Sequence, residues 1–415
     1  MIPKAELMAV AAETGLLPTT VEKDYALGWV LFATADHRLL GRWYFKGGTC
    51  LKKCYFDTYR FSEDLDFTVP PDVAYDVNAI QDGLLGVAEW VRERAGLEFP
   101  AEGVEVTESI NKRGRRTYEG RMTFVGPLRL ARAQRQRIRF DLTQDEVVLD
   151  PDESREVFHG YSDAPDPLPR VRCYSLGEIL AEKVRALVER SGRARDVYDV
   201  VNVGRNLRAD LPRDGVAGLA ARKFAFKALE PPTPERILAK VDPEVLATDW
   251  TQALRHQLPV LPPVGDFVTA LREILGSLLG MAPAAPVLAA VPVRQGETPV
   301  PRVRFAQPVG ATGPLGLGDR MSAGPWPMEA YGSRMDRVRY AARNRLLARI
   351  TYHGVSRLVE PYSLRMPKTG NLLLYVFELE RGLSAGEGIK AFTVGELGEV
   401  QVTDRAFQPR YLVEL

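Results

Sequence analysis

The sequence is poor in cysteine and histidine, and it carries no excess of charge of either sign. Only three cysteines occur, Cys50, Cys54 and Cys173, and they follow no framework spacing. Such a sparse, odd-numbered set excludes a disulfide-stabilised secreted domain and favours a reducing compartment. Since the four histidines lie far from the cysteines along the chain, the sequence also argues against a zinc site.

Two further absences concern membranes. The first fifteen residues, MIPKAELMAVAAETG, lack a basic stretch followed by an apolar one, so they do not form a signal peptide. No apolar run is long enough to span a bilayer. We therefore expect a cytoplasmic protein without membrane contact. Because the net charge is only +1, local clusters of charge are more informative than the total.

The length and the distribution of proline and glycine indicate how the chain is divided. At 415 residues we expect two or three domains. Residues 280–327 are dominated by Pro, Gly, Ala and Val without helical or strand periodicity, which is typical of an extended linker. This linker separates residues 1–279 from 328–415. The pattern in the first part predicts an α+β unit, with strands in about 40–145 and helices in about 175–279.

Two aspartates stand out in FKGGTCLKKCYFDTYRFSEDLDFTV, residues 45–69. If RFSEDLDFTV forms a strand, its side chains alternate, and Ser62, Asp64 and Asp66 share one face while apolar side chains lie on the other. Carboxylates two positions apart lie at about 6–7 Å between Cα atoms. These hard oxygen ligands suit a Mg²⁺ ion that also contacts substrate phosphates. The alternative is the solvated face of an amphipathic strand.

A glycine pair precedes these aspartates. Gly47 and Gly48 follow the apolar strand WYF, and Thr49 is suited to cap a helix that begins at Leu51. Backbone amides at such a turn bind anions, for example the tail of a triphosphate. A glycine pair alone is usually only a turn. Followed about fifteen residues later by S-x-D-x-D, it supplies the phosphate donors and metal ligands that nucleotidyl transfer requires.

A lysine interrupts the apolar stripe of the helix predicted for LGEILAEKVRALVERSG, residues 176–192. Lys183 has apolar residues three and four positions away on both sides, so its ammonium must reach the edge of the stripe or find a partner. The following GRARDVYDV places Asp196 and Asp199 about one turn apart on a second helix. These acids form either an ordinary ion pair with the lysine or part of a catalytic pocket.

Three segments together resemble a known family: KGGTCLKKCYFDTYRFSEDLDF, VEKDYALGWVLFA and AEKVRALVERSGRARDVYDV. They are similar to motifs of the AbiEii/AbiGii toxin family, a branch of the DNA polymerase β-like nucleotidyltransferases. The resemblance covers about residues 10–275. It implies a polymerase β-like core with a helical C-terminal part.

The resemblance also implies roles for individual residues. Asp64, Asp66 and Lys183 would act in catalysis, the two aspartates would bind Mg²⁺, and Asp196 would be a catalytic acid. Asp199 would be either a further acid or a brace for its helix. Ser62 would contact a phosphate or be a site of regulatory modification. The residues implied to bind the nucleoside triphosphate are Gly47, Gly48, Thr49, Ser62 and Lys183.

Members of this superfamily usually carry a third metal-binding carboxylate on a neighbouring strand. Asp141 in RIRFDLT is the candidate, since strand alternation puts it on one face with Arg137 and Arg139. The alternative is an exposed face of mixed charge. The implied reaction is in-line attack of an acceptor hydroxyl on the α-phosphorus of the triphosphate, with pyrophosphate leaving.

Residues 111–139 concentrate basic side chains against a single acid, Glu119. Such a surface suits a nucleic-acid backbone, and Tyr118 and Phe124 would stack bases if they were exposed. The alternative is a solvated hairpin. The basic residues are Lys112, Arg113, Arg115, Arg116, Arg121, Arg129, Arg132, Arg135, Arg137 and Arg139.

Residues 328–415 begin with a basic helix and continue with short strands that break at HG, EP and KTG, which indicates a small barrel or sandwich. ITYHG, RLVEPYSL and the final F-x-P-R resemble a WYL domain, an Sm/SH3-like β unit of regulators that bind nucleic-acid or nucleotide ligands. The Trp-Tyr-Leu motif itself is missing, and three leucines, residues 372–374, stand in its place. Four arginines are either target contacts or an exposed face: Arg339, Arg343, Arg345 and Arg349.

Together these patterns predict a Mg²⁺-dependent nucleotidyltransferase toxin of a toxin–antitoxin or phage-defence system. It would transfer a nucleotide to RNA, most of all tRNA, and so block translation. The resemblance implies a cognate antitoxin protein. Two alternatives stay open: the same chemistry on a small hydroxylated molecule such as an antibiotic, or an inert ligand-sensing regulator. The basic segment argues against the former, and the intact set of polar motif residues argues against the latter.

Overall fold

The computed structural model describes residues 1–14, 16–56, 60–206, 213–258, 260–280, 334–365, 372–382, 384–411 and 413–415. The described residues belong to one compact unit, Met1–Met281 with Ala330–Leu415. Apart from its first residue, the predicted linker 280–327 lies outside the described residues, so the domain boundaries stay predictions.

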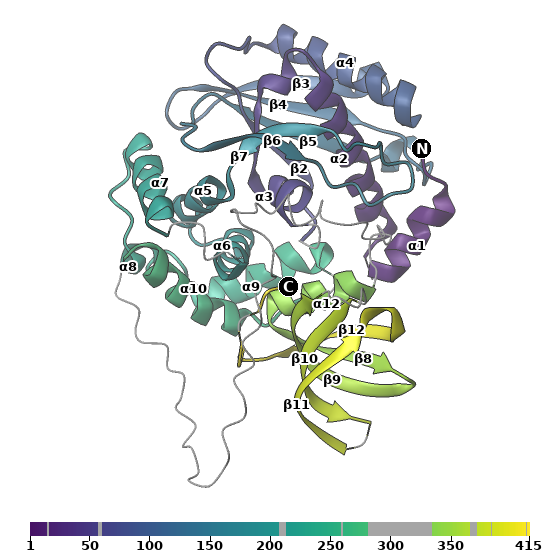
Figure 1. The fold of residues 1–415 in the computed structure, drawn as a ribbon. Coiled ribbons are helices and arrows are strands. Elements are labelled where there is room, and N and C mark those ends of the chain that lie inside the picture. The colour runs from purple at the N-terminus through teal and green to yellow at the C-terminus, as the bar shows by residue number, and fades with distance from the viewer. Residues whose placement is uncertain are drawn as a thin grey trace, which may run out of the picture. The chain divides into compact units, whose positions relative to one another are not determined.

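The first part of the chain is built on a seven-stranded mixed sheet with the order β3-β4-β5-β2-β1-β7-β6 (Figure 1). In it β2 pairs antiparallel with β1 and parallel with β5. The last two strands lie beyond the strand region predicted from the sequence. The strands are β1 (Tyr44–Lys46), β2 (Asp64–Thr68), β3 (Val104–Ile110), β4 (Arg116–Thr123), β5 (Arg137–Thr143), β6 (Pro151–Glu156) and β7 (Arg170–Tyr174).

One face of this sheet is apolar and lies under two helices. Leu65 and Phe67 of β2 and Phe140 of β5 are buried on it, as strand alternation predicts. The helices α2 (Pro18–Asp36) and α4 (Val77–Ala95) pack against each other and against strands of the sheet (Figure 1). The side chains between these apolar residues therefore point to the opposite face, where the aspartates lie.

The helices predicted after the strand region are confirmed. Ser175 caps the first of them by accepting a hydrogen bond from the Glu178 amide at 3.1 Å. The predicted short break is made by Ser191 and Gly192, both with positive φ. The helices are α5 (Leu176–Glu189), α6 (Ala194–Asn206), α7 (Arg213–Phe226), α8 (Pro234–Leu238), α9 (Pro243–Leu254) and α10 (Val264–Leu278).

Shorter elements complete this part of the chain. They are α1 (Lys4–Thr14), η1 (Leu40–Arg42), α3 (Gly47–Cys50), η2 (Leu51–Tyr55), η3 (Ala101–Gly103), η4 (Arg132–Gln134) and η5 (Arg255–Gln257). Within the parts of the chain that the structure describes, no helix is long and apolar enough to cross a membrane.

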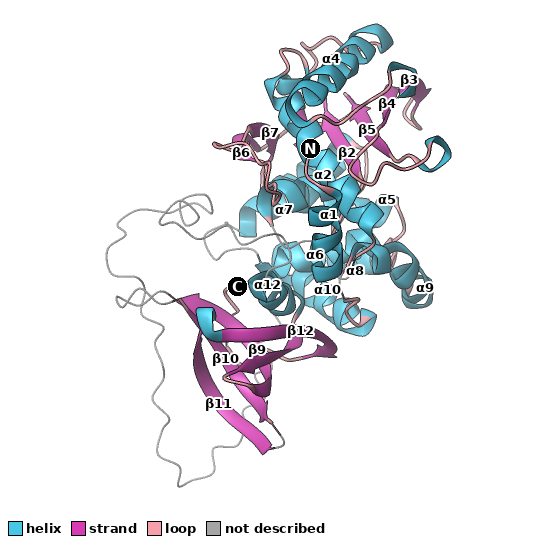
Figure 2. Ribbon diagram, turned by 90° about the vertical axis from the view of Figure 1, so that its right-hand side faces the viewer, coloured by secondary structure: helices cyan, strands magenta, loops and turns pink. Residues whose placement is uncertain are grey.

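The C-terminal part is a basic helix followed by one five-stranded antiparallel sheet, ordered β11-β10-β9-β8-β12 (Figure 2). His353 and Gly354, both with positive φ, form the tight turn predicted at HG. The predicted break at EP is wrong, because Pro361 lies inside β9 at an irregularity in its pairing with β10. The elements are α12 (Arg334–Asn344), β8 (Leu346–Tyr352), β9 (Val355–Arg365), β10 (Leu373–Arg381), β11 (Ser384–Thr393), η6 (Val394–Glu396) and β12 (Leu397–Ala406).

Three predictions for this C-terminal part stay open. The break at KTG lies outside the described residues. The predicted WYL identity and the Sm/SH3-like fold stay predictions, since the sheet by itself identifies neither. Among the arginines offered as target contacts, Arg339 lies 3.5 Å from Asp336 and Arg349 lies 3.4 Å from Glu380. All four of these arginines are half-buried, so the alternative of an exposed face does not describe them.

Candidate active site

Strand register brings the predicted carboxylates onto one face of the sheet. In the β2–β5 ladder Asp66 is the partner of Asp141, and Asp64 is the partner of Arg139. Asp64, Asp66 and Asp141 are all half-buried, whereas the residues between them are buried on the opposite face. We call Asp64, Asp66 and Asp141 the carboxylate face. The predicted grouping of two motif aspartates with a third acid from another strand is therefore present in the structure.

Two acids of the carboxylate face, Asp66 and Asp141, have raised pKa values. Burial raises the pKa of Asp66 to about 6, and Asp141 and Asp64 add to the shift against the opposing charges of Lys46 and Lys183. Burial and the neighbouring Asp64 also raise the pKa of Asp141. Like charges at this spacing need a cation to be stable as a fully ionised set.

The glycine turn packs directly against Asp66. Gly47 has φ +77°, and a Cβ added to it would collide with the Asp66 carboxylate. The helical segment begins at this turn, with α3 starting at Gly47 and η2 continuing to Tyr55. The first amides of a helix have no partner inside the helix, so the turn presents donors beside the carboxylate face.

The predicted capping role of Thr49 is wrong. The helix begins at Gly47 rather than Leu51, which places Thr49 inside it, and the residue is buried. Its hydroxyl donates to the backbone carbonyl of Asp64 at 2.6 Å. Thr49 therefore ties the glycine turn to the first residue of β2. Ser62 is half-buried and close to Gly48, since a Cβ added there would lie 3.1 Å from the Ser62 hydroxyl.

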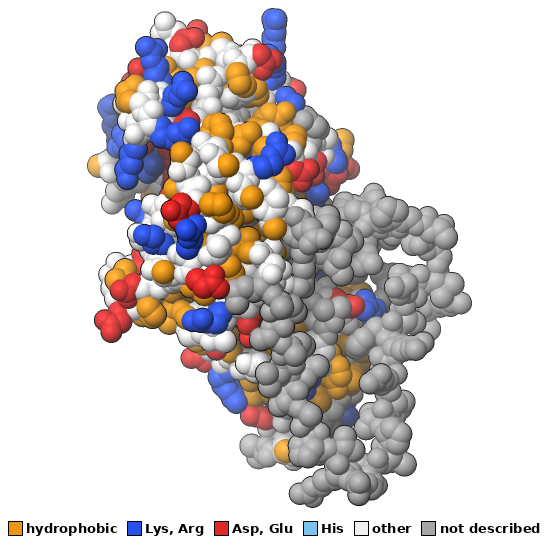
Figure 3. Space-filling model, turned by 90° about the vertical axis from the view of Figure 1, so that its left-hand side faces the viewer, with side chains coloured by type: hydrophobic (Ala, Val, Ile, Leu, Met, Phe, Trp, Pro, Cys, Tyr) orange, Lys and Arg blue, Asp and Glu red, His pale blue; other side chains and the backbone are white. Residues whose placement is uncertain are grey.

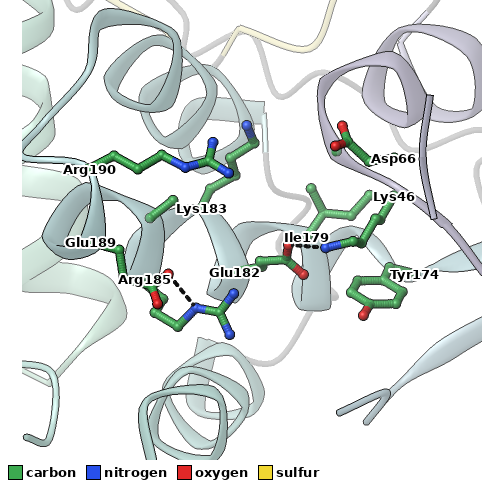
Figure 4. A pocket seen from close by; sticks show the side chains of 11 residues that line it. Lys46, Asp66, Tyr174, Ile179, Glu182, Lys183, Arg185, Glu189 and Arg190 are labelled. Atoms are coloured by element: carbon green, nitrogen blue, oxygen red, sulfur yellow. Dashed lines mark hydrogen bonds and ion pairs between the residues drawn. The ribbon is translucent and has the colours of Figure 1, made fainter. Parts of the chain in front are cut away.

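A pocket of about 490 Å³, including its open mouth, lies beside Asp66 (Figure 4). One wall is formed by Lys46, Gly47 and Asp66, and the other is formed largely by α5. Four cations and three acids line the pocket, which suits an anionic ligand. The lining residues are Lys46, Gly47, Asp66, Tyr174, Ile179, Glu182, Lys183, Arg185, Ala186, Glu189 and Arg190.

Lys46 joins the two walls of this pocket. It is the β1 partner of Asp66, and its ammonium lies 2.6 Å from a Glu182 carboxylate oxygen on α5 (Figure 4). Burial opposes the charge of Lys46, but Glu182, Glu146 and Asp66 hold its pKa above the ordinary value. The same lysine charge lowers the pKa of Glu182. Lys46 and Glu182 are therefore both charged at neutral pH.

The ammonium of Lys183 is paired with acids and does not extend to the edge of its helix. Its ammonium donates to Asp196 at 3.0 Å and lies 2.9 Å from Asp199. Arg60 binds both oxygens of Asp199 through Nε and Nη2 at 2.7 Å each. We call Arg60, Lys183, Asp196 and Asp199 the Lys183 cluster. Lys183 is therefore ion-paired, as one alternative predicted, and it also lines the pocket, whose catalytic role stays a prediction.

The two acids of the Lys183 cluster, Asp196 and Asp199, contact its cations in different ways. Asp199 is completely buried between Arg60 and Lys183, which agrees with the predicted brace. Burial opposes its charge, but Arg60 and Lys183 lower its pKa. Asp196 is 2% exposed and does not line the pocket. Its carboxylate holds the ammonium of Lys183, so it is placed to orient that lysine.

The donors of the carboxylate face are of the type that binds Mg²⁺. They are all carboxylate oxygens, on adjacent positions of two paired strands, and Mg²⁺ is usually held by one or two carboxylates plus substrate phosphates. Across the described part of the chain, no three His, Cys, Asp or Glu side chains are arranged to hold an ion. Instead the guanidinium of Arg139 lies within ion-pair distance of Asp64 and Asp141.

The basic segment is a surface, but its aromatic residues are not. Tyr118 and Phe124 are each 2% exposed, so the predicted base stacking is wrong: alternation along β4 turns Tyr118 into the core. Most of the cations are exposed. Several have acidic neighbours, as Arg113 has Asp145 at 2.9 Å. Figure 3 shows Lys and Arg side chains gathered toward the upper left edge of one face.

Several site residues escaped prediction because only tertiary pairing reveals them. Lys46 stands next to the glycine pair, but its position opposite Asp66 depends on the β1–β2 register. Arg60 reaches α6, which lies more than a hundred residues later. Glu182 immediately precedes Lys183 on α5. Its position on that helix was the one signal in the sequence that could have placed it in the same pocket as Lys183.

The family model of the nucleotidyl transferase AbiEii toxin, of type IV toxin–antitoxin systems, matches residues 29–276. This chain belongs to the AbiEii toxin family. The AbiEii chain is therefore a nucleotidyltransferase, which sets aside the inert regulator, and its family implies a nucleoside triphosphate substrate and an antitoxin partner.

Among solved structures, the AbiEii chain is similar to MenT4, a nucleotidyltransferase toxin from Mycobacterium tuberculosis H37Rv. The identity is 20% and the TM-score 0.47, over 68% of this chain and 91% of that chain. No curated protein matches the AbiEii chain.

Proposed function

We propose that this nucleotidyltransferase moves a nucleoside monophosphate from a triphosphate to an RNA acceptor, tRNA above all, and thereby blocks translation. The observation that carries the proposal is the strand register that sets Asp66 beside Asp141 at the edge of a cation-lined pocket. Metal ligands and phosphate donors on adjacent elements are what transfer at an α-phosphorus needs.

The residues divide into three tasks in this proposal. Asp64, Asp66 and Asp141 would hold Mg²⁺, which would supply charge neutralisation at the phosphates and activation of the acceptor oxygen. The amides of the glycine turn, together with Ser62 and Lys183, bind the triphosphate. The nucleotide enters the pocket beside α5 with its phosphates toward the carboxylate face.

The Lys183 cluster positions the donor rather than reacting with it. Lys183 has three donor hydrogens, and Asp196 and Asp199 fix its ammonium from the buried side. The ammonium also lines the pocket, where it is able to bind a phosphate oxygen. Asp196 and Asp199 accordingly act through Lys183, which limits the lysine to one orientation.

The basic segment supports RNA over a small acceptor. Exposed cations such as Lys112, Arg115 and Arg132 have no acidic partner among the described residues and suit phosphates of a polynucleotide. A C-terminal WYL-like domain would then sense ligands or bind the target. The proposed site of action is the cytoplasm, with a cognate antitoxin as partner.

One incubation tests this function. Purified full-length protein is mixed with total tRNA, Mg²⁺ and each labelled triphosphate in turn, beside the double variant Asp64→Ala, Asp66→Ala. We expect label in tRNA with the wild-type protein and none with the variant. Equal labelling by both proteins would remove the role given to the aspartates. If label entered small molecules of a cell extract and not RNA, the acceptor would be a small molecule instead of RNA.

A further inference from the structure

Arg139 is held loosely by the acids around it. Its Nε lies 3.8 Å from Asp64 Oδ1, and its Nη2 lies 3.5 Å from Glu119 Oε2 and 3.6 Å from Asp141 Oδ2. A well-formed hydrogen bond between a guanidinium and a carboxylate has a nitrogen–oxygen distance of about 2.7–2.9 Å. Arg139 therefore neutralises three acids at once without making an optimal bond to any one of them.

Strand pairing and side-chain alternation fix the position of Arg139 on the sheet. Arg139 pairs with Asp64 in the β2–β5 ladder, and strand alternation puts it on the same face as Asp141. Its side chain is 44% exposed, so solvent is open to it. Burial opposes its charge, but Asp64, Asp141 and Glu119 still raise the pKa of Arg139. The guanidinium thus stays charged beside two acids of the carboxylate face.

A guanidinium and a divalent ion compete to neutralise the same carboxylate oxygens. A bound ion needs carboxylate oxygens at about 2.0–2.1 Å, a convergence that the described side chains do not show. Glu119 lies on β4 opposite Asp141, on the same face of the sheet, but it is not one of the three acids proposed to bind the ion, and it also pairs with Arg121. It offers Arg139 a partner that a metal-bound carboxylate face does not require.

We propose that Arg139 is a counter-ion that competes with the divalent cation for Asp64 and Asp141. It stabilises the acids while the ion is absent and moves toward Glu119 or solvent when the ion binds. The proposal rests on the proposed function, because it takes the carboxylate face as the metal site. Arg139 is thus a positioning residue that sets how much divalent ion the enzyme needs before nucleotide arrives.

The chain offers a matched control for this proposal. Arg137 lies two residues earlier on the same strand and the same face, is exposed, and has no acidic partner among the described residues. Arg137→Gln and Arg139→Gln remove the same charge from the same surface. Only Arg139→Gln also removes a competitor from the carboxylate face.

The test is a titration of the nucleotide-free, full-length protein with Mn²⁺, followed by electron paramagnetic resonance of the unbound ion. Arg139→Gln should bind Mn²⁺ on the order of tenfold more tightly than the wild type, and Arg137→Gln within about twofold of it. Arg139→Lys keeps one compact charge that cannot span three acids, so its affinity should rise by about threefold. This second variant carries the test if Arg139→Gln fails to melt cooperatively.

A second readout avoids metal binding as the only measure. Without divalent ion Arg139→Gln should melt at a lower temperature than the wild type, and Mn²⁺ should raise its melting temperature by more. Unchanged or weaker Mn²⁺ binding by the Arg139 variants, or equal tightening by Arg137→Gln, would refute the competition. If Asp66→Asn binds Mn²⁺ as tightly as the wild type, the metal site itself is misplaced and the proposed function fails instead.

Discussion

The carboxylate face and the Lys183 cluster both gather aspartates beside cations, yet they satisfy their charges differently. In the Lys183 cluster Asp199 receives two bonds of 2.7 Å from Arg60 and lies 2.9 Å from Lys183, all away from solvent. On the carboxylate face the nearest arginine lies at 3.6 Å or more from Asp64 and Asp141, and these acids are half-buried. A cluster that is complete within the protein supports the fold, whereas an incompletely neutralised one is ready to take a ligand.

The largest effect should come from neutralising the carboxylate face. The double variant Asp64→Asn, Asp66→Asn should lose at least about 10³-fold in transferase activity, which is about 4 kcal/mol of transition-state stabilisation. Its melting temperature should stay the same or rise, because the substitution removes like charges that repel each other. Nucleotide incorporation and thermal unfolding measure the two effects. A large loss of stability would mean that the face is structural.

The opposite result is expected from the Lys183 cluster. Asp199→Asn leaves Arg60 and Lys183 buried without their shared counter-ion, and breaking a buried pair typically costs about 3–5 kcal/mol of unfolding free energy. Urea unfolding of the full chain measures this loss. Glu89→Gln, which breaks an exposed ion pair with Arg92, is the control and should leave stability nearly unchanged. Equal losses of unfolding free energy in Asp199→Asn and Glu89→Gln would contradict the distinction between a completely and an incompletely neutralised cluster.

Acid should sharpen the same contrast. The pKa of Asp199 is lower in the folded protein than in the unfolded chain, so its stabilisation is fully present above the unfolded pKa and is lost as the pH falls through the folded one. The stability difference between wild type and Asp199→Asn should therefore be constant near neutral pH and shrink below about pH 4. Urea unfolding across this range measures it. A difference independent of pH would show that the carboxylate charge contributes nothing.

A smaller loss of stability than that of Asp199→Asn should come from the glycine turn. Gly47→Ala costs about 1–2 kcal/mol because φ is positive, and the added methyl group also displaces the Asp66 carboxylate. Gly96→Ala is the matched control, since Gly96 has φ +67° and an added Cβ would meet only Met1 Cβ, at 3.8 Å. Both variants should lose similar stability, while only Gly47→Ala should lose activity, by more than about tenfold. Equal activities would show that the turn does not position Asp66.

Local patterns predicted the elements and failed where distant segments meet. The glycine pair, the alternation around Asp64 and Asp66, and the lysine inside an apolar stripe are visible within a few residues of sequence. Pairing of β1, β2 and β5 is not, and it alone places Lys46 and Arg139 against the acids. The exposure of side chains was not predictable from local sequence either. Tyr118 is aromatic and has arginines near it in the sequence, but its side chain points into the core. The polar partners of a buried charge, such as Arg60 for Asp199, likewise depend on the packed fold.

The pocket has one wall drawn from a β-ladder and another drawn from a helix, and this division affects how its specificity can diverge. A strand cannot slip by one residue without turning its entire set of acids to the other side of the sheet. Single residues at the C-terminal end of α5, such as Glu189 and the following Arg190, can be exchanged one at a time without moving the helix. Relatives of this enzyme should therefore keep the ladder wall and alter the helical wall when they change the nucleotide they accept.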